Sequence, residues 1–156
     1  RGRRTEVAVT SFWYSRAIGG AFDNDIDLVG GTDDVYVGLT DDDYTPDQDT
    51  HDFWDDVVAE ELANGNGYTT NGFQLTGDTF TQSANVWTWD ANDPSWTTAT
   101  FSAYKAVYYD RSTGGSDAAR RLISYVLFGG AETVSSGTFT IVHNASGIAT
   151  VTVGDA

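Results

Sequence analysis

Residues 122–128 read LISYVLF and predict an extended segment. Apolar side chains lie on both of its faces. A strand with one face in water alternates apolar and polar residues, whereas a strand covered on both faces does not. This stretch therefore predicts a central strand, and we expect it to form the middle of the hydrophobic core.

Other strand-like runs lie on both sides of this segment. Residues 33–39 alternate, with Val35, Val37 and Leu39 on one face. After residue 73, β-branched and aromatic runs are separated by Asn, Asp, Gly and Pro clusters; these runs are 74–81, 85–89, 97–109, 122–128, 137–143 and 147–153. The pattern predicts a mainly β fold, a single β-sandwich or barrel of about seven to nine antiparallel strands with one or two short helices.

Two local structures can be predicted at the ends of the chain. Residues 11–18 form a short helix that Gly19 and Gly20 end. The runs 137–143 and 147–153 flank the turn residues 144–147, which predicts a terminal hairpin.

The segment from Tyr44 to Gly77 predicts a framework of turns rather than a site of chemistry. Pro46 sets a turn in which Asp47 bonds to its own backbone two residues on. Thr50 or Asp52 then caps one helical turn. That turn carries Phe53 and Trp54 inward, and positive φ or close backbone approach is expected at Gly65, Gly67 and Gly72.

Length and charge limit the organisation and the partners. The 156 residues fit one domain, with residues 1–10 as a basic N-terminal arm and residues 11–156 as a single β-rich domain. The arm carries Arg1, Arg3 and Arg4, which can dock on an acidic neighbour; the alternative is a frayed terminus. The net charge of −15 repels phosphate backbones, so no nucleic-acid partner is expected. No apolar run is long enough for a membrane span.

Catalytic motifs are absent from the sequence. Cysteine does not occur, and His51 and His143 lie 92 positions apart without a metal-binding partner at short spacing. A local hydrogen-bonding role is expected for His51, and a satisfied structural role for His143. We therefore expect no enzymatic activity and no cofactor.

An acidic segment gives the one candidate metal site. The pattern Asp-x-Asp-x-Asp at residues 23–27 resembles the opening of a calcium loop, although Leu28 stands where such loops have glycine. The calcium candidates are Asp23, Asp25, Asp27 and Asp34. A second acidic cluster, residues 41–49, is expected to be a solvated loop.

The tryptophans suggest a contact surface. Trp87 and Trp89 share one face of their predicted strand, and an indole joins a large apolar area to one hydrogen-bond donor. Such residues can anchor a subunit interface, stack on sugar rings or fill the core. The interface candidates are Trp54, Trp87, Trp89 and Trp96, together with the three arginines of the arm.

The order of these features resembles a family of small structural proteins of tailed double-stranded DNA viruses. The resemblance runs from about residue 11 to residue 153, and Asn71 departs from it where a second glycine is usual. It rests on the segments 34–39, 44–47, 51–53, 67–69, 75–77, 89–91, 106–110, 123–129 and 137–141, with Trp96 and Gly147-Ile148.

The resemblance implies a virion protein without catalytic residues. The leading expectation is a capsid decoration or cement-type subunit that forms a homo-oligomer and binds other virion proteins. The alternatives are a tail, neck or fibre-associated subunit, or a glycan-binding module for host attachment.

Overall fold

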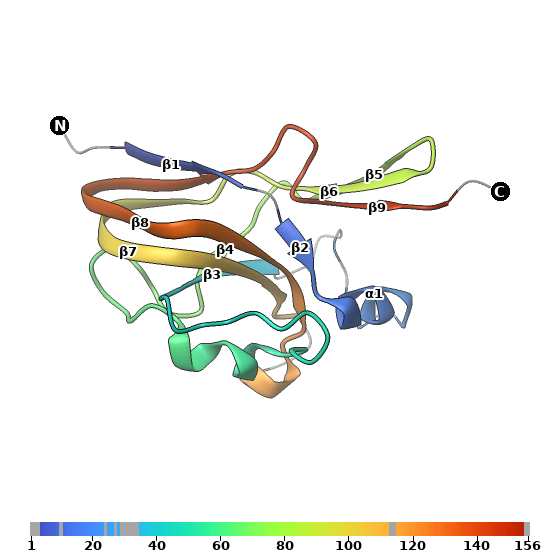
Figure 1. Ribbon diagram of the computed structural model, residues 1–156, viewed down its shortest axis with the longest axis horizontal. Coiled ribbons are helices and arrows are strands. Elements are labelled where there is room, and N and C mark those ends of the chain that lie inside the picture. Colours follow the sequence, from blue (N-terminus) through green and yellow to red (C-terminus); the bar gives the residue numbers. More distant parts are fainter. Residues whose placement is uncertain are drawn as a thin grey trace.

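The computed structural model describes residues 4–9, 11–23, 25–26, 28, 35–112 and 115–154, which form a mainly β fold. The described strands make two sheets, a large curled one and a small one, and this architecture is compatible with a β-sandwich or barrel (Figure 1). The predicted fold class is confirmed. Within the described residues, no helix has the length and apolar character that a membrane span needs.

The large sheet is built around two long strands. β7 (Ser95–Asp110) and β8 (Leu122–Val142) pair antiparallel, and β3 (Val35–Thr40) and β4 (Phe73–Gln74) extend the sheet beyond β7. β1 (Arg4–Ala8) and β2 (Ser11–Trp13) lie along the other edge of β8. Because β1 pairs in parallel, the sheet is mixed rather than wholly antiparallel.

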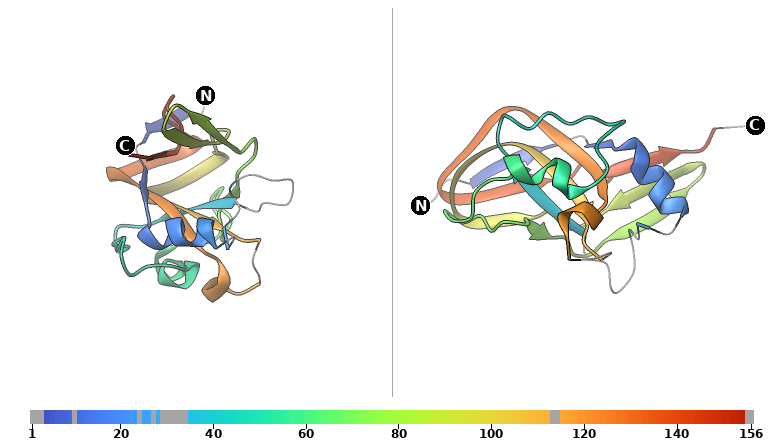
Figure 2. Two further views of the ribbon diagram at one scale, coloured as in Figure 1. Left: turned by 90° about the vertical axis from the view of Figure 1, so that its right-hand side faces the viewer. Right: turned by 90° about the horizontal axis from the view of Figure 1, so that it is seen from below.

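The small sheet lies at one end of the molecule. Its order is β5 (Thr79–Ser83), β6 (Val86–Asp90) and β9 (Ala149–Thr152), all antiparallel. The helix α1 (Ser15–Phe22) lies at this same end (Figure 2). Three short 3-10 helices complete the described elements: η1 (Trp54–Asp56), η2 (Val58–Glu60) and η3 (Asp117–Ala119).

The predicted central strand is the first part of β8. Residues 122–126 are all buried, and the strand has neighbours on both edges, as expected from its apolar faces. Leu127 departs from this pattern and is 47 % exposed. The pairing with β7 is interrupted just beyond it, since residues 128–131 of β8 have no partner between Lys105↔Leu127 and Ala103↔Glu132.

The core is closely packed because large aromatic rings lie against residues with small side chains. Trp54 is fully buried and stacks on Tyr109 at 4.0 Å between ring centroids. Its indole occupies the space over Gly38 on β3, where any side chain would collide with the ring. The alternation predicted for β3 is confirmed, since Val35, Val37 and Leu39 are all buried.

The turn before η1 has the chemistry that its sequence predicts. Asp47 Oδ1 accepts hydrogen bonds from the backbone N–H groups of Asp49 and Thr50, at 3.0 and 3.1 Å. Gly65, Gly67 and Gly72 all have positive φ, as expected.

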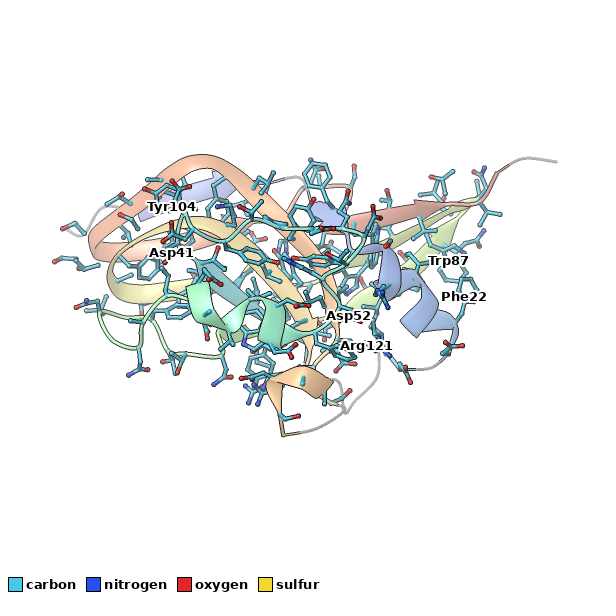
Figure 3. The ribbon with its side chains drawn as sticks, turned by 60° about the horizontal axis from the view of Figure 1, so that its bottom comes forward. Phe22, Asp41, Asp52, Trp87, Tyr104 and Arg121 are labelled. Atoms are coloured by element: carbon cyan, nitrogen blue, oxygen red, sulfur yellow. The ribbon has the colours of Figure 1, made fainter. Side chains whose placement is uncertain are left out.

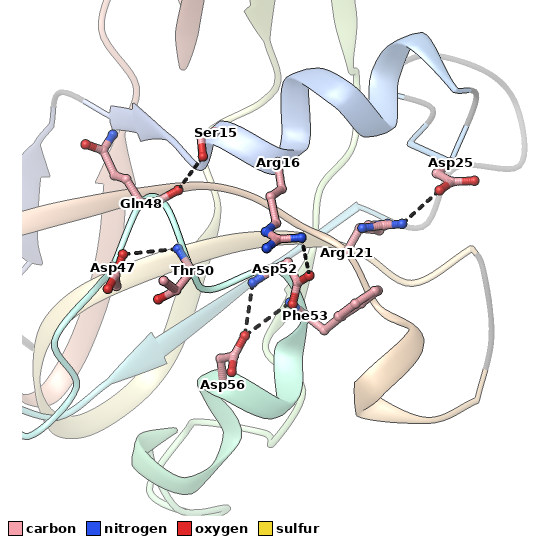
Figure 4. Close-up of polar contacts among 10 residues, drawn as sticks. All are labelled: Ser15, Arg16, Asp25, Asp47, Gln48, Thr50, Asp52, Phe53, Asp56 and Arg121. Atoms are coloured by element: carbon pink, nitrogen blue, oxygen red, sulfur yellow. Dashed lines mark hydrogen bonds and ion pairs between the residues drawn. The ribbon is translucent and has the colours of Figure 1, made fainter.

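The predicted cap of η1 is wrong. Neither Thr50 nor Asp52 caps the turn, and Asp56 within η1 reaches back instead (Figure 4). Its Oδ2 accepts the N–H groups of Asp52 at 3.0 Å and of Phe53 at 3.4 Å. Trp54 points inward as predicted, whereas the half-buried Phe53 lies under the guanidinium of Arg121, 4.6 Å away.

The predicted boundaries of the first helix are also wrong. Residues 11–13 form β2, and α1 runs through Gly19 and Gly20. Gly20 is buried, and a Cβ there would stand 3.0 Å from Ile26 Cδ1. This glycine allows a close contact inside the helix rather than ending it.

The predicted terminal hairpin is a crossing between sheets. Residues 144–147 make a turn, but the strand before it belongs to the large sheet and β9 pairs with β6. Ile148 donates its N–H to Trp89 O at 2.7 Å, which carries the chain onto β6. Long-range pairing therefore overrides the local hairpin signal.

The predicted basic arm is partly a strand. Residues 4–8 form β1 and pair with residues 138–142 of β8, so they belong to the domain rather than to a separate arm. Arg1 and Arg3 lie outside the described residues, as does the Arg4 side chain.

Candidate functional site

An apolar hollow lies between α1 and the small sheet. Its volume is about 450 Å³, which falls within the usual range for sites that bind ligands or side chains. The floor includes Ile123 of β8 and Trp13 of β2. All its lining side chains are apolar.

One wall of the hollow is a face of α1. Ala17, Ile18, Ala21 and Phe22 all line the hollow, and their spacing places them on one side of the helix. The opposite wall comes from the small sheet, where Phe80 of β5, Trp87 of β6 and Val151 of β9 line it. Trp87 and Phe80 stack at 5.0 Å between ring centroids.

The rim of the hollow exposes large apolar side chains. Phe22 is 87 % exposed, Val153 is 56 % exposed and Trp87 is 38 % exposed. Figure 3 shows Phe22 and Trp87 together at one end of the molecule. Contiguous exposed apolar surface of this kind marks an interaction site more often than a passive surface.

Many of the acidic residues of the chain lie in a segment that does not line the hollow. Residues 41–61 include ten Asp and Glu and no Lys or Arg. Asp41, in this segment, lies toward the end of the molecule opposite Phe22 (Figure 3). A chain with net charge −15 therefore presents an uncharged hollow at one end.

The predicted tryptophan interface is largely wrong. Trp54 and Trp89 have no exposed surface and Trp96 is 5 % exposed, so these three side chains belong to the core of this one chain. Trp89 packs between Trp13 and Tyr108, at 6.0 and 5.7 Å between ring centroids. Trp87 alone of the four candidates retains a substantial exposed face.

The position of the two tryptophans of β6 explains this difference. Both point to the same face of the small sheet, as predicted, but Trp89 lies where that face meets the large sheet. Trp87 lies two residues earlier, where the same face borders the hollow. Alternation in the sequence predicts that the two tryptophans share a face of the strand. It cannot show where the large sheet stops covering that face.

The calcium hypothesis stays a prediction. Asp25 forms an ion pair with Arg121 at 2.9 Å, and Asp23 is exposed just beyond α1. Asp27 and Asp34 lie outside the described residues. Within the part of the chain that the structure describes, no group of three or more acidic or histidine side chains is arranged to hold a metal ion.

His51 makes local hydrogen bonds and His143 is a buried residue with its hydrogen bonds satisfied, as the sequence predicts. His51 Nδ1 lies 3.1 Å from Tyr44 Oη, which in turn lies 2.6 Å from Tyr14 Oη. His143 is buried, with Nδ1 3.0 Å from the carbonyl oxygen of Ala91 and Nε2 3.0 Å from Tyr108 Oη. Because a carbonyl only accepts, Nδ1 donates to it, and in the neutral tautomer with this proton Nε2 accepts from Tyr108 Oη.

A half-buried carboxyl group links three positions of the segment from residue 61 to residue 71. Glu61 Oε1 accepts hydrogen bonds from Tyr68 Oη at 2.8 Å and from the N–H of Asn71 at 2.6 Å. Burial raises the pKa of Glu61 above its ordinary value, although these two hydrogen bonds act in the opposite direction. Asn71 itself has a φ of 70° and also accepts from Arg120 and Tyr109. The residue that departs from the expected glycine is therefore the centre of a structural network.

Sequence reasoning missed Phe22 and the hollow. Ending the helix at Gly19 left Ala21 and Phe22 outside any element. If the helix continues to residue 22, the pairs Ala17-Ile18 and Ala21-Phe22 recur at a spacing of four, which is the signal of an apolar helix face.

Comparisons of the chain with family models, with curated proteins and with solved structures found no match.

Proposed function

We propose that this chain is a non-enzymatic structural protein of a tailed-virus particle, a capsid decoration or cement-type subunit that binds neighbouring virion proteins. The ordered sequence patterns that resemble small virion proteins suggest the setting. The observation that carries the proposal is the uncharged hollow with its exposed rim of Phe22, Trp87 and Val153. Such a surface offers contact area without any group that could perform chemistry.

Binding energy alone is the proposed mechanism. Full burial of one large apolar side chain contributes about 1.5–3 kcal/mol, so the three rim residues together supply several kcal/mol. Association itself costs about 4–15 kcal/mol in lost translational and rotational freedom. One hollow is therefore a weak site, and we infer that the subunit is held on the particle by several contacts that act together.

The structure favours a protein partner over a glycan. Sugar recognition needs polar groups beside the aromatic ring, and the surroundings of Trp87 in the hollow are apolar. A tail, neck or fibre position remains the second candidate within the same class. Copy number decides between them, because hundreds of copies per particle indicate the capsid and tens or fewer indicate the tail.

The proposal can be tested by adding the protein back to particles that lack it. Wild-type chain, Phe22→Ser and Leu127→Ser would be mixed with such particles, and bound copies and resistance to heat and osmotic shock would be measured. Leu127 is a matched control because it is 47 % exposed and does not line the hollow.

We expect the wild type and Leu127→Ser to bind and to restore resistance, and Phe22→Ser to bind weakly. Particles that are equally resistant with and without the protein would refute the cementing role.

A further inference from the structure

The hollow has two complementary features on one face. Its open volume of about 450 Å³ exceeds the roughly 150 Å³ that suffices for a benzene ring in an apolar cavity. Phe22, at the last position of α1, carries such a ring and leaves it 87 % exposed at the rim. The protruding ring thus lies at the edge of a hollow that can hold one, and Figure 3 shows it beside Trp87 of the lining.

A small apolar ligand would cover only part of this apolar surface. It would fill the hollow, but Phe22 and Val153 would stay largely in water. A protein surface covers the hollow and its rim together. A face that carries both a knob and a hole is complementary to itself under a two-fold axis, because each copy then supplies the ring that the other receives.

Charge argues against a basic partner at the hollow itself. A basic protein would be attracted to the acidic segment 41–61, whereas the hollow has no ionisable lining. Two chains of net charge −15 repel each other, so the apolar contact has to outweigh this repulsion. Two carboxylates border the hollow: Asp23 is exposed next to Phe22, and Asp25, which pairs with Arg121, precedes Ile26 of the lining.

We propose that a second copy of this chain covers the hollow, with Phe22 of each copy inserted between α1 and the small sheet of the other. This inference rests on the proposed function only in that it names the partner of the same surface. The contact is isologous, and each dimer contains it twice.

Sedimentation equilibrium of the intact chain at low and high salt tests the proposal. We expect a monomer–dimer equilibrium that strengthens with salt, because screening weakens the repulsion between like charges. Phe22→Ser should weaken dimerisation at least about tenfold, Asp23→Asn should strengthen it, and Leu127→Ser should leave it unchanged. A protein that stays monomeric up to about 1 mM in high salt, or a dimer that is indifferent to Phe22→Ser, would overturn the proposal.

A mixing experiment tests the reciprocal geometry. Val151→Trp fills the hollow from the strand side and leaves Phe22 in place, whereas Phe22→Ser removes the ring and leaves the hollow open. Circular dichroism checks that each variant folds. Neither variant should dimerise alone, but their mixture should form a heterodimer with one intact contact. A mixture no more associated than its components contradicts a two-fold arrangement, and a copurified apolar compound found on a monomer by native mass spectrometry identifies a ligand pocket instead.

Failure of this inference can be distinguished from failure of the proposed function. If the chain is monomeric but its binding to particles still depends on Phe22, the second copy is the wrong partner and the virion role stands. If the chain dimerises through Phe22 and binds no particle, the dimer is correct and the virion role is wrong.

Discussion

The indole of Trp54 lies so close over Gly38 that a Cβ on residue 38 would stand 2.2 Å from Trp54 Cη2. This contact lets η1 pack directly on β3 and aligns Trp54 with Tyr109 in a stack whose planes differ by 17°. A glycine in the middle of a strand normally weakens it, and here it allows one of the fully buried tryptophan rings of the core to fit.

Gly38→Ala should therefore destabilise the protein. We expect a loss of about 2–3 kcal/mol in the free energy of unfolding, because the ring must move and nothing around it is free to give way. Urea unfolding measures the loss, and near-ultraviolet circular dichroism should report the disturbed stack. Gly19→Ala is the matched control: a Cβ there meets nothing within 4 Å, and alanine is the better helix former by about 0.5–1 kcal/mol. Equal stability of Gly38→Ala and wild type would show that Trp54 does not occupy this position.

Glu61 should make stability depend on pH. Because burial raises its pKa above the ordinary value of 4.5, the folded state holds the proton more tightly than the unfolded state. Its contribution is thus fully present below pH 4.5 and is lost as pH rises through the folded pKa. Glu61→Gln retains an acceptor for Tyr68 and Asn71 and carries no charge. The stability of wild type relative to Glu61→Gln should therefore fall as pH rises through this range.

Comparing Glu61→Leu with Glu61→Gln separates the hydrogen bonds from the charge. Leucine leaves the hydroxyl of Tyr68 and the N–H of Asn71 without their acceptor, which should cost about 2–3 kcal/mol relative to Glu61→Gln at every pH. Chemical denaturation at pH 4 and pH 7 measures both variants. If Leu and Gln at this position were equally stable, the network would have no structural importance.

The hydrogen bond between Tyr108 and His143 should stabilise the joint between the sheets. Tyr108→Phe removes the hydroxyl that forms a hydrogen bond with His143 Nε2 in the buried core, and we expect a loss of about 1–2 kcal/mol. Tyr104→Phe, at a half-buried position of the same strand, should change stability by less than about 0.5 kcal/mol. Thermal unfolding of the two variants measures the difference, and similar melting temperatures would show that this hydrogen bond does not stabilise the joint.

Phe22 should be dispensable for folding. Its side chain is 87 % exposed, so Phe22→Ser should alter the free energy of unfolding by no more than about 0.5 kcal/mol. Trp89→Ala, by contrast, empties a fully buried position and should cost about 3–5 kcal/mol. If Phe22→Ser unfolded the protein, Phe22 would be a core residue and the rim of the hollow would lie elsewhere.

The sequence predicts the class of fold because its strongest signals are local. Apolar residues on both faces of residues 122–126 and alternation in β3 reflect burial directly. Pairing between distant segments is harder to predict from the sequence. The parallel partner of β1 and the passage of β9 to the small sheet depend on tertiary contacts that no window of sequence contains.

The site was harder to predict than the fold for a related physical reason. The sequence around a strand tryptophan alternates in the same way whether another layer of the fold covers the side chain, as at Trp89, or leaves it partly exposed, as at Trp87. The glycines at positions 19 and 20 resemble a helix end, and only the contact of Gly20 with Ile26 shows why they lie inside the helix. The hollow arises where α1 and the small sheet face each other, and these elements are far apart in the sequence.

The proposed virion role is tested most directly by a cryo-electron microscopy map of native particles of the tailed virus that, on this proposal, encodes the chain. We predict density for this fold at many symmetric positions on the capsid, with the face that contains Phe22 and Trp87 covered by a neighbouring subunit. Particles without this density, or a map in which the hollow faces solvent at every position, would contradict the account.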